Sequence, residues 1–186
     1  MPEGAARPGE AGHQYQITEV GRRLSRLPVD PRIGRMLVAA EAEGCVGEVV
    51  VLAAGLSIQD PRERPMERAG AADEAHKVFR DETSDFLTLL NVYEQYQHAA
   101  EDRGSSALAS WCREHFINAN RMREWEETAR QLGDLMALGE AKAPPPALLR
   151  SATSPAGGGG GERIHRALLT GLLSNLACRT DGSGYE

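Results

Sequence analysis

Residues 46–56 read VGEVVVLAAGL, and this stretch decides the class of fold. It is preceded by Gly44, which breaks the chain, and it carries apolar residues on nearly every side of a helix. Such a helix is normally central to a hydrophobic core. It is far shorter than the ~18–20 apolar residues of a membrane span. The stretch therefore predicts a soluble, mainly α-helical domain built around one buried helix.

Two further helices are predicted upstream of this stretch. Thr18 is a suitable N-cap for a helix that runs to about Leu24. In the turn that follows, Asp30 is a suitable N-cap and Pro31 a suitable first residue, because the missing N–H of proline costs nothing there. The apolar residues that then share one helix face are Ile33, Met36, Leu37 and Ala40. His13–Thr18 is the only plausible strand in the chain.

The downstream sequence predicts a series of helices joined by polar segments. The clearest amphipathic segment has a narrow apolar stripe with steps of three and four residues: Met122, Trp125, Ala129, Leu132 and Met136. The other expected elements are, in order, an extended loop at 57–68, a short helix at 73–80, helices at 84–97 and from Ser105 or Ser106 to Phe116, a flexible Pro/Gly connector at 143–161, and a last helix at 164–176.

The charge distribution is uneven. The formal net charge of −6 argues against a dedicated nucleic-acid binder, because binding phosphates requires clustered Lys and Arg. Between Arg22 and Arg35, however, there are five arginines and one aspartate. Between Asp73 and Asp102 there are eight acidic and two basic residues. Such a chain can present one basic surface while it is acidic overall.

The cysteine pattern indicates a reducing compartment. Cys45, Cys112 and Cys178 are far apart in the sequence and form no CxxC pair. They indicate neither a disulfide framework nor a zinc site, so we expect a cytoplasmic protein. Cys112 and His115 are three residues apart on a predicted helix, but two ligands alone are a weak metal signal, and packing roles are expected for both.

Residues 73–76 spell Asp-Glu-Ala-His, the signature of a class of ATPases. In those enzymes the motif ends a buried strand beside a phosphate-binding loop. The preceding residues 67–72 (ERAGAA) carry no strand signal, and no GxxxxGK[ST] motif is present. We expect Asp73 and Glu74 instead to begin a helix, where carboxylates interact favourably with the helix dipole. No catalytic, cofactor-binding or metal-binding residue is therefore assigned in this chain.

Several blocks of sequence resemble bacterial DEAH-box RNA helicases of the HrpA type. Residues 17–37 (ITEVGRRLSRLPVDPRIGRML) resemble the segment that closes the winged-helix domain of that family. Residues 49–65, with their QDPRERP ending, are similar to the next block in the HrpA branch. Residues 84–93 (SDFLTLLNVY), 111–132 (beginning WCREHFINANRMREW) and 164–174 (IHRALLTGLLS) resemble the helical ratchet domain that follows.

The resemblance implies a division of the chain into segments. It places the end of a winged-helix domain at 15–43, a helical ratchet domain at 44–178, and the start of an oligonucleotide-binding fold at 179–186. Composition indicates a disordered leader at 1–14. The expected fold is thus a mainly α, ratchet-like bundle preceded by the end of a winged-helix unit. The ATPase core and the first winged-helix elements have no counterpart in this sequence.

The resemblance also implies a function. The fragment would be an accessory domain of a 3′–5′ ATP-dependent RNA helicase. It would pack on two RecA-like motor domains of the same polypeptide, which bind ATP and Mg²⁺, and would form a wall of the channel for single-stranded RNA. The arginines between Arg22 and Arg35, among them Arg23 and Arg32, suit contact with the motor or with RNA phosphates. A merely solvated helix face is the alternative for these arginines.

Asn118 and Arg121 are the other candidates for RNA contact. Helical projection from Met122 places Asn118 inside the apolar stripe and Arg121 about 50° to one side, with Arg123 on the opposite face. A polar group in such a stripe needs a partner. Either Asn118 bonds a neighbouring helix terminus and Arg121 a nearby carboxylate, or this edge faces RNA, with Arg121 on a phosphate and Asn118 on a ribose or base edge.

A second function, from a different class, is a stand-alone acidic helical scaffold that binds protein partners. We expect a scaffold to begin and end at capped elements, whereas this chain begins and ends in elements that look incomplete. The sequence favours the helicase interpretation on that ground. It indicates no membrane association and leaves the oligomeric state open.

Overall fold

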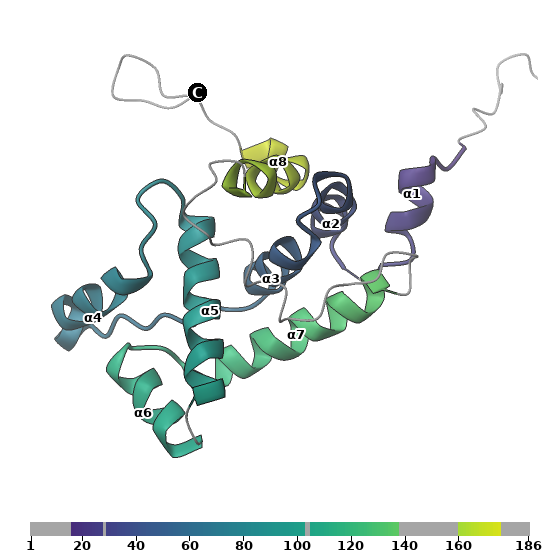
Figure 1. Cartoon of the computed structure of the whole chain (residues 1–186). Helices are drawn as coiled ribbons and strands as arrows, with labels where there is room; N and C mark the ends of the chain where they lie inside the picture. The colour runs from purple at the N-terminus through teal and green to yellow at the C-terminus, as the bar shows by residue number, and fades with distance from the viewer. Residues whose placement is uncertain (1–15, 28, 103–104, 138–159, 176–186) are drawn as a thin grey trace, which may run out of the picture.

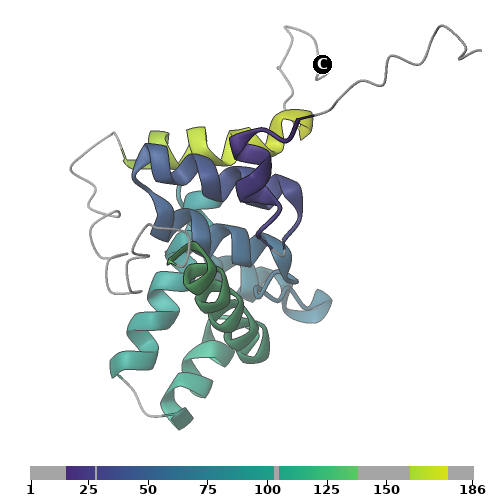
Figure 2. The same ribbon diagram turned by 90° about the vertical axis from the view of Figure 1, so that its right-hand side faces the viewer.

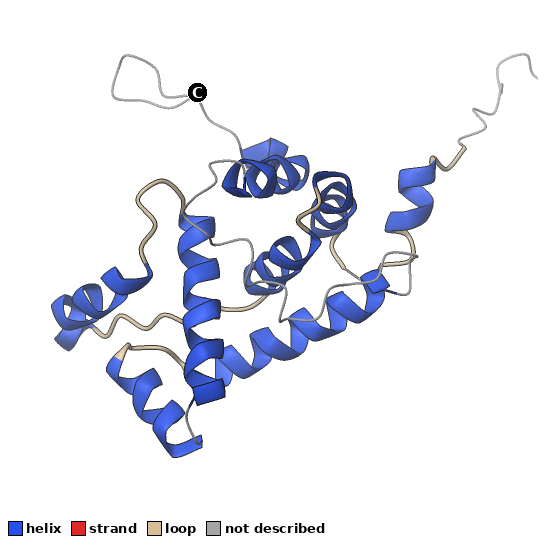
Figure 3. Cartoon of the chain, viewed as in Figure 1, coloured by secondary structure: helices blue, strands red, loops and turns tan. Residues whose placement is uncertain are grey.

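A computed structural model describes residues 16–27, 29–102, 105–137 and 160–175. In these residues the regular structure is helical, as Figures 1 and 3 show. The helices are α1 (Glu19–Leu24), α2 (Pro31–Glu43), α3 (Val46–Ser57), α4 (Ala69–His76), α5 (Asp85–Asp102), α6 (Ser105–Glu114), α7 (Ala119–Ala137) and α8 (Gly160–Leu172), with short 3₁₀ turns at Met66–Arg68, Lys77–Phe79 and Leu173–Asn175. The predicted mainly α fold is confirmed. None of these helices combines the length and apolar character of a membrane span.

The ends of α1 and α2 follow the predicted capping residues. The Thr18 hydroxyl accepts a hydrogen bond from the Gly21 amide at 3.0 Å, and an Asp30 carboxylate oxygen accepts one from the Arg32 amide at 2.8 Å. Both bonds satisfy amides that a helix start leaves without intrahelical partners. Gly44 ends α2 at φ +66°, a left-handed conformation that glycine adopts without strain.

Helix α3 is the centre of the core, as its sequence predicts. Its residues 49–54 are all buried, and it packs against α2, α5, α7 and α8. Figure 2 shows α8, α2 and α3 stacked in successive layers, and α2 and α8 have the most extensive contact. The predicted boundary between two domains, at residues 43 and 44, lies between α2 and α3. These two helices pack together in the core without interruption, and the boundary stays a prediction.

The contact between α7 and α3 depends on one tryptophan. Trp125 is fully buried, and its indole N–H donates to the Val51 carbonyl at 2.7 Å. The ring lies so close to Gly55 that a β-carbon at this position would be 2.5 Å from Trp125 Cζ2. The other members of the predicted stripe, Met122, Ala129, Leu132 and Met136, are buried beside it. The helical spacing of α7 therefore identified its core face correctly.

Three local predictions differ from the structure. Gln16–Thr18 form no strand, and residues 13–15 lie outside the described part of the chain. The short helix α4 begins at Ala69 rather than Asp73, since the alanine-rich segment 69–72 favours helix by itself. Asp73 and Glu74 thus lie in the second half of α4, and the helix-dipole explanation for them is wrong.

At the C-terminal side, α8 begins at Gly160 rather than Ile164. The rest of the predicted connector, like the predicted segments 1–14 and 179–186, lies outside the described residues. Two polar contacts fix α8 in place besides its apolar face. His165 Nε2 is 2.6 Å from the Ser84 hydroxyl at the start of α5, and Arg166 pairs with Glu43 at the end of α2.

Candidate functional site

Asn118 caps the start of α7 and does not lie inside the apolar stripe. Its side-chain oxygen accepts hydrogen bonds from the amides of Asn120 at 3.0 Å and Arg121 at 3.1 Å. Its amide nitrogen donates to Glu63 at 2.7 Å. The helical projection misplaced Asn118 because a capping residue leaves helical geometry one step before the helix begins.

Arg121 contacts the loop between α3 and α4. Its guanidinium donates to the Asp60 carbonyl at 2.9 Å, so its partner is a backbone oxygen and not the carboxylate expected. Arg121 is half-buried, whereas Arg123 is exposed and donates to Asn120 at 2.9 Å. The two arginines therefore differ as the projection predicted: one lies against the molecule and the other extends from it.

The loop that Arg121 and Asn118 hold is itself well ordered by hydrogen bonds. The Asn118 amide donates to the Pro61 carbonyl and the Glu63 amide to the Phe116 carbonyl, both at 2.8 Å. Arg62 forms an isolated antiparallel bridge with Ile117. We name residues 58–63 together with 116–121 the loop clamp. The clamp joins segments more than fifty residues apart in the sequence.

An ion pair inside the loop clamp adds to this order. The Asp60 carboxylate lies 2.6 Å from the Arg62 guanidinium. Burial by itself raises the pKa of Asp60, but the hydrogen bonds from the Arg62 side chain and amide outweigh burial and hold that pKa below its ordinary value. Asp60 is consequently a carboxylate at neutral pH.

The predicted arginines of α1 and α2 have different partners. Arg23 forms an ion pair with Glu41 of α2, which ties the two helices together. Arg22 donates to the Ile17 carbonyl at 3.3 Å. Arg32 is exposed, and no hydrogen bond or ion pair of its side chain occurs within the described ranges; the same holds for Arg26 and Arg35.

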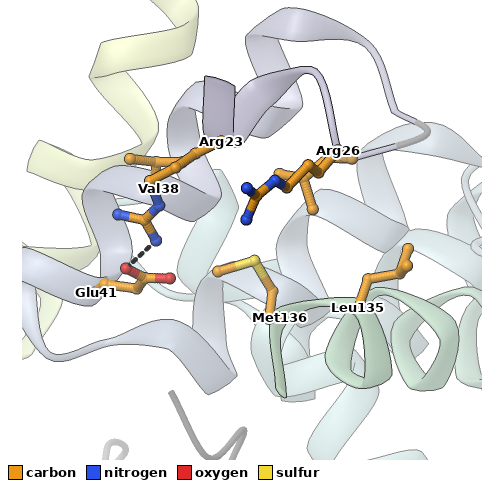
Figure 4. Close-up of a pocket in the computed structure, with 7 residues that line it drawn as sticks. Arg23, Arg26, Val38, Glu41, Leu135 and Met136 are labelled. Carbon is orange, nitrogen blue, oxygen red and sulfur yellow. Dashed lines mark hydrogen bonds and ion pairs between the residues drawn. The ribbon is translucent and has the colours of Figure 1, made fainter. Parts of the chain in front are cut away.

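A cavity of about 230 Å³ lies where α1, α2 and the end of α7 meet. Figure 4 shows Arg23 and Glu41 paired on one side, Arg26 extending over it, and Met136 and Leu135 below. We name it the junction pocket. Its full lining is Arg23, Arg26, Leu27, Val38, Glu41, Leu135 and Met136. Sequence reasoning missed this pocket, because its lining residues come from three separate stretches of chain.

Two of the candidate RNA contacts, Asn118 and Arg23, lie at opposite ends of α7. Asn118 precedes its first residue, whereas Leu135 and Met136 near its last residue border the junction pocket beside Arg23. At a rise of 1.5 Å per residue, the length of α7 separates them by roughly 27 Å. They therefore do not form one compact site.

The Asp-Glu-Ala-His segment lies on a helix, without the strand context of an ATPase motif. Asp73 pairs with Arg64 at 2.6 Å, and Glu74 pairs with Lys77 one turn later. The hydrogen bond from Arg64 lowers the pKa of Asp73 below its ordinary value. His76 Nε2 lies 3.4 Å from the Phe116 carbonyl. The segment is thus placed for surface ion pairs and for contact with the loop clamp.

His115 takes part in aromatic packing, and Cys112 lies in the hydrophobic core. His115 stacks on Trp111 with ring centroids 4.4 Å apart, and its Nδ1 lies 2.8 Å from the Trp111 carbonyl. Cys112 is buried, and burial raises the pKa of its thiol. No group of three potential metal ligands occurs within the residues that the structure describes.

Comparison with known proteins agrees with this helical architecture. Residues 30–89 match the helicase associated domain (HA2), ratchet-like. This match covers α2 to the first part of α5, the segment that contains the central helix α3 and the loop after it. The fold and the match together identify residues 30–89 as part of a ratchet-like helicase-associated domain.

The curated relatives specify the type. The chain is 40% identical over 177 residues to the ATP-dependent RNA helicase HrpA of Escherichia coli, covering 95% of this chain and 13% of the relative. It is 36% identical to the HrpA homolog of Haemophilus influenzae (91% and 12%) and 32% identical to the pre-mRNA-splicing factor ATP-dependent RNA helicase prp22 of Schizosaccharomyces pombe (90% and 13%). The chain belongs to the HrpA-type helicase-associated regions and spans about an eighth of these relatives' length.

Proposed function

We propose that this chain is an accessory domain of an ATP-dependent RNA helicase of the 3′–5′ DEAH-box type. It packs on the RecA-like motor domains, lines the channel for single-stranded RNA, and couples ATP hydrolysis to unwinding. ATP and Mg²⁺ bind to the motor domains, and the protein works in the cytoplasm. Support comes from the similarity to HrpA over 95% of the chain and from the arginines of α1 and α2.

The observation that carries the proposal is the pair Arg32 and Arg35 on α2. They are three residues apart, so they share one side of the helix, and both are exposed. Met36, Leu37 and Ala40 form the buried side. The chain has a net charge of −6, yet these two exposed arginines have no carboxylate partner in the described residues. Their N–H groups can therefore donate hydrogen bonds to an external anion. Guanidinium groups suit phosphates, and such contacts position a protein on nucleic acid.

Arg121 and Asn118 are proposed as a second contact, and they differ in how freely they can reach RNA. Both ends of the Asn118 amide are already bonded within the loop clamp. Arg121 uses one guanidinium nitrogen for the Asp60 carbonyl, which leaves other donors of its planar group for a phosphate. Of this pair, Arg121 is therefore the better candidate for direct RNA contact, and Asn118 holds the clamp in shape.

The test is a chimera in which this chain replaces its counterpart in E. coli HrpA. Arg32→Ala/Arg35→Ala is compared with Arg80→Ala/Arg113→Ala, a matched loss of two exposed arginines elsewhere on the surface. If Arg32 and Arg35 contact phosphates, the slope of log affinity for single-stranded RNA against log salt falls by about 0.7 per lost contact, about 1.4 in total. Equal slopes in the two double variants contradict the proposal.

A further inference from the structure

The junction pocket has the composition of a peptide-docking site. Its apolar walls come from Leu27, Val38, Leu135 and Met136, which belong to three different parts of the chain. Leu27, Val38 and Leu135 are each half-buried, so they expose apolar surface to the pocket. A buried apolar anchor held in such a pocket is the usual centre of a protein–protein contact.

The charges around the pocket favour an acidic occupant. Arg23 and Glu41 neutralise each other across the opening. Arg26 is exposed at the same opening, and its side chain makes no ion pair or hydrogen bond within the described part of the chain. The pocket thus offers one uncompensated positive charge next to apolar walls. A carboxylate beside an apolar anchor complements both features.

A nucleotide fits the pocket less well than a peptide. Bases of single-stranded nucleic acids stack on aromatic side chains, and no aromatic residue lines this pocket. The arginines proposed for phosphate contact, Arg32 and Arg35, do not line it either. Arg23 is the one candidate RNA contact that lines the pocket, and its charge is already paired with Glu41. The pocket therefore differs in chemistry from the proposed RNA surface and shares only Arg23 with it.

We propose that the junction pocket docks an acidic peptide segment of another protein, with one leucine- or phenylalanine-sized side chain inserted between Val38, Leu135 and Met136 and a neighbouring carboxylate on Arg26. The inference does not rest on the helicase function, because the pocket and its charge are properties of this chain. Docking there would connect α1 and α2 to the end of α7 through a shared partner.

The test uses a display library of short random peptides selected on the full chain, followed by fluorescence anisotropy of labelled copies of the enriched peptides. We expect acidic sequences with a conserved leucine or phenylalanine. Arg26→Glu should weaken their binding at least tenfold, as loss of a complementary charge pair does. Leu135→Ala should also weaken it. Arg113→Glu, the same charge change at an exposed arginine outside the pocket, should leave the affinity within about threefold.

Circular dichroism melting checks that each variant is folded. Arg26→Glu is the deciding variant, because the Arg26 side chain is exposed and its replacement leaves the core unchanged. Enriched peptides that bind Arg26→Glu and the parent chain equally well overturn the proposal. So does a selection that enriches no acidic sequence. Displacement of the peptides by short polyuridine, with RNA binding that depends on Arg26, would instead assign the pocket to RNA and also overturn it.

Discussion

Gly55→Ala is expected to destabilise the protein, although alanine is the better helix former. Glycine in a helix interior costs about 1 kcal/mol relative to alanine, so propensity alone predicts a gain. A β-carbon at Gly55, however, would lie 2.5 Å from Trp125 Cζ2 and 2.7 Å from Cε2, well inside contact distance. Trp125 is fully buried, with the Tyr93 ring centroid 5.2 Å from its own, so the indole has little room to move.

The magnitude follows from three contributions. Overpacking a core typically costs about 1–3 kcal/mol. Moving the indole away from the Val51 carbonyl, 2.7 Å from its N–H, breaks a hydrogen bond that contributes about 0.5–1.5 kcal/mol. The higher helix propensity of alanine offsets about 1 kcal/mol of these two costs. We therefore expect the free energy of unfolding to fall by about 0.5–3.5 kcal/mol relative to the parent chain.

Urea denaturation followed by circular dichroism measures this change. Gly133→Ala in α7 is the matched control, because a β-carbon there would meet no side chain and no neighbouring element within 4 Å. This variant should gain about 0.5–1 kcal/mol. Trp125→Phe removes the ring atoms that clash, so Gly55→Ala should cost at least about 0.5 kcal/mol less in that background. A Gly55→Ala variant as stable as the parent, or an equal cost in both backgrounds, would refute the reasoning.

Four further predictions concern function and pH. In the HrpA chimera, Arg121→Ala should reduce RNA-stimulated ATP hydrolysis and Arg123→Ala should not; equal hydrolysis with a lower melting temperature for Arg121→Ala would leave Arg121 a structural residue. The chain alone should neither bind nor hydrolyse ATP, since it has no phosphate-binding loop; saturable binding of a fluorescent ATP analogue at micromolar concentration would contradict this. RNA affinity of the chain alone should be weak and fall with salt, given the net charge of −6; tight binding that persists at high salt would show the electrostatic argument to be wrong. Burial raises the pKa of Tyr93 and Tyr96 to about 12 and that of Cys45 to about 11. At high pH the folded state therefore retains protons that the unfolded chain loses, and the free energy of unfolding should fall as pH rises from about 9 to 12. A urea midpoint that stays constant over this range would contradict this prediction.

Much of the helical architecture is determined by local sequence. Thr18 and Asp30 cap α1 and α2 as predicted, because a capping bond involves residues only two or three positions away. The stripe on α7 and the apolar run of α3 identified the core, because burial follows the helical period. The resemblance to DEAH-box helicases also rests on contiguous sequence blocks.

The tertiary structure alone decided how the candidate site is built. Glu63 and Asp60 meet Asn118 and Arg121 across more than fifty residues, and no sequence period specifies such a pairing. The start of α4 at Ala69 reflects the helix propensity of the alanines in 69–72, whereas the prediction of a start at Asp73 relied on the acidic residues. The junction pocket forms where separate stretches of chain converge. Hydrogen-bond partners and cavities depend on which segments pack together, whereas caps and apolar faces depend on near neighbours in the chain.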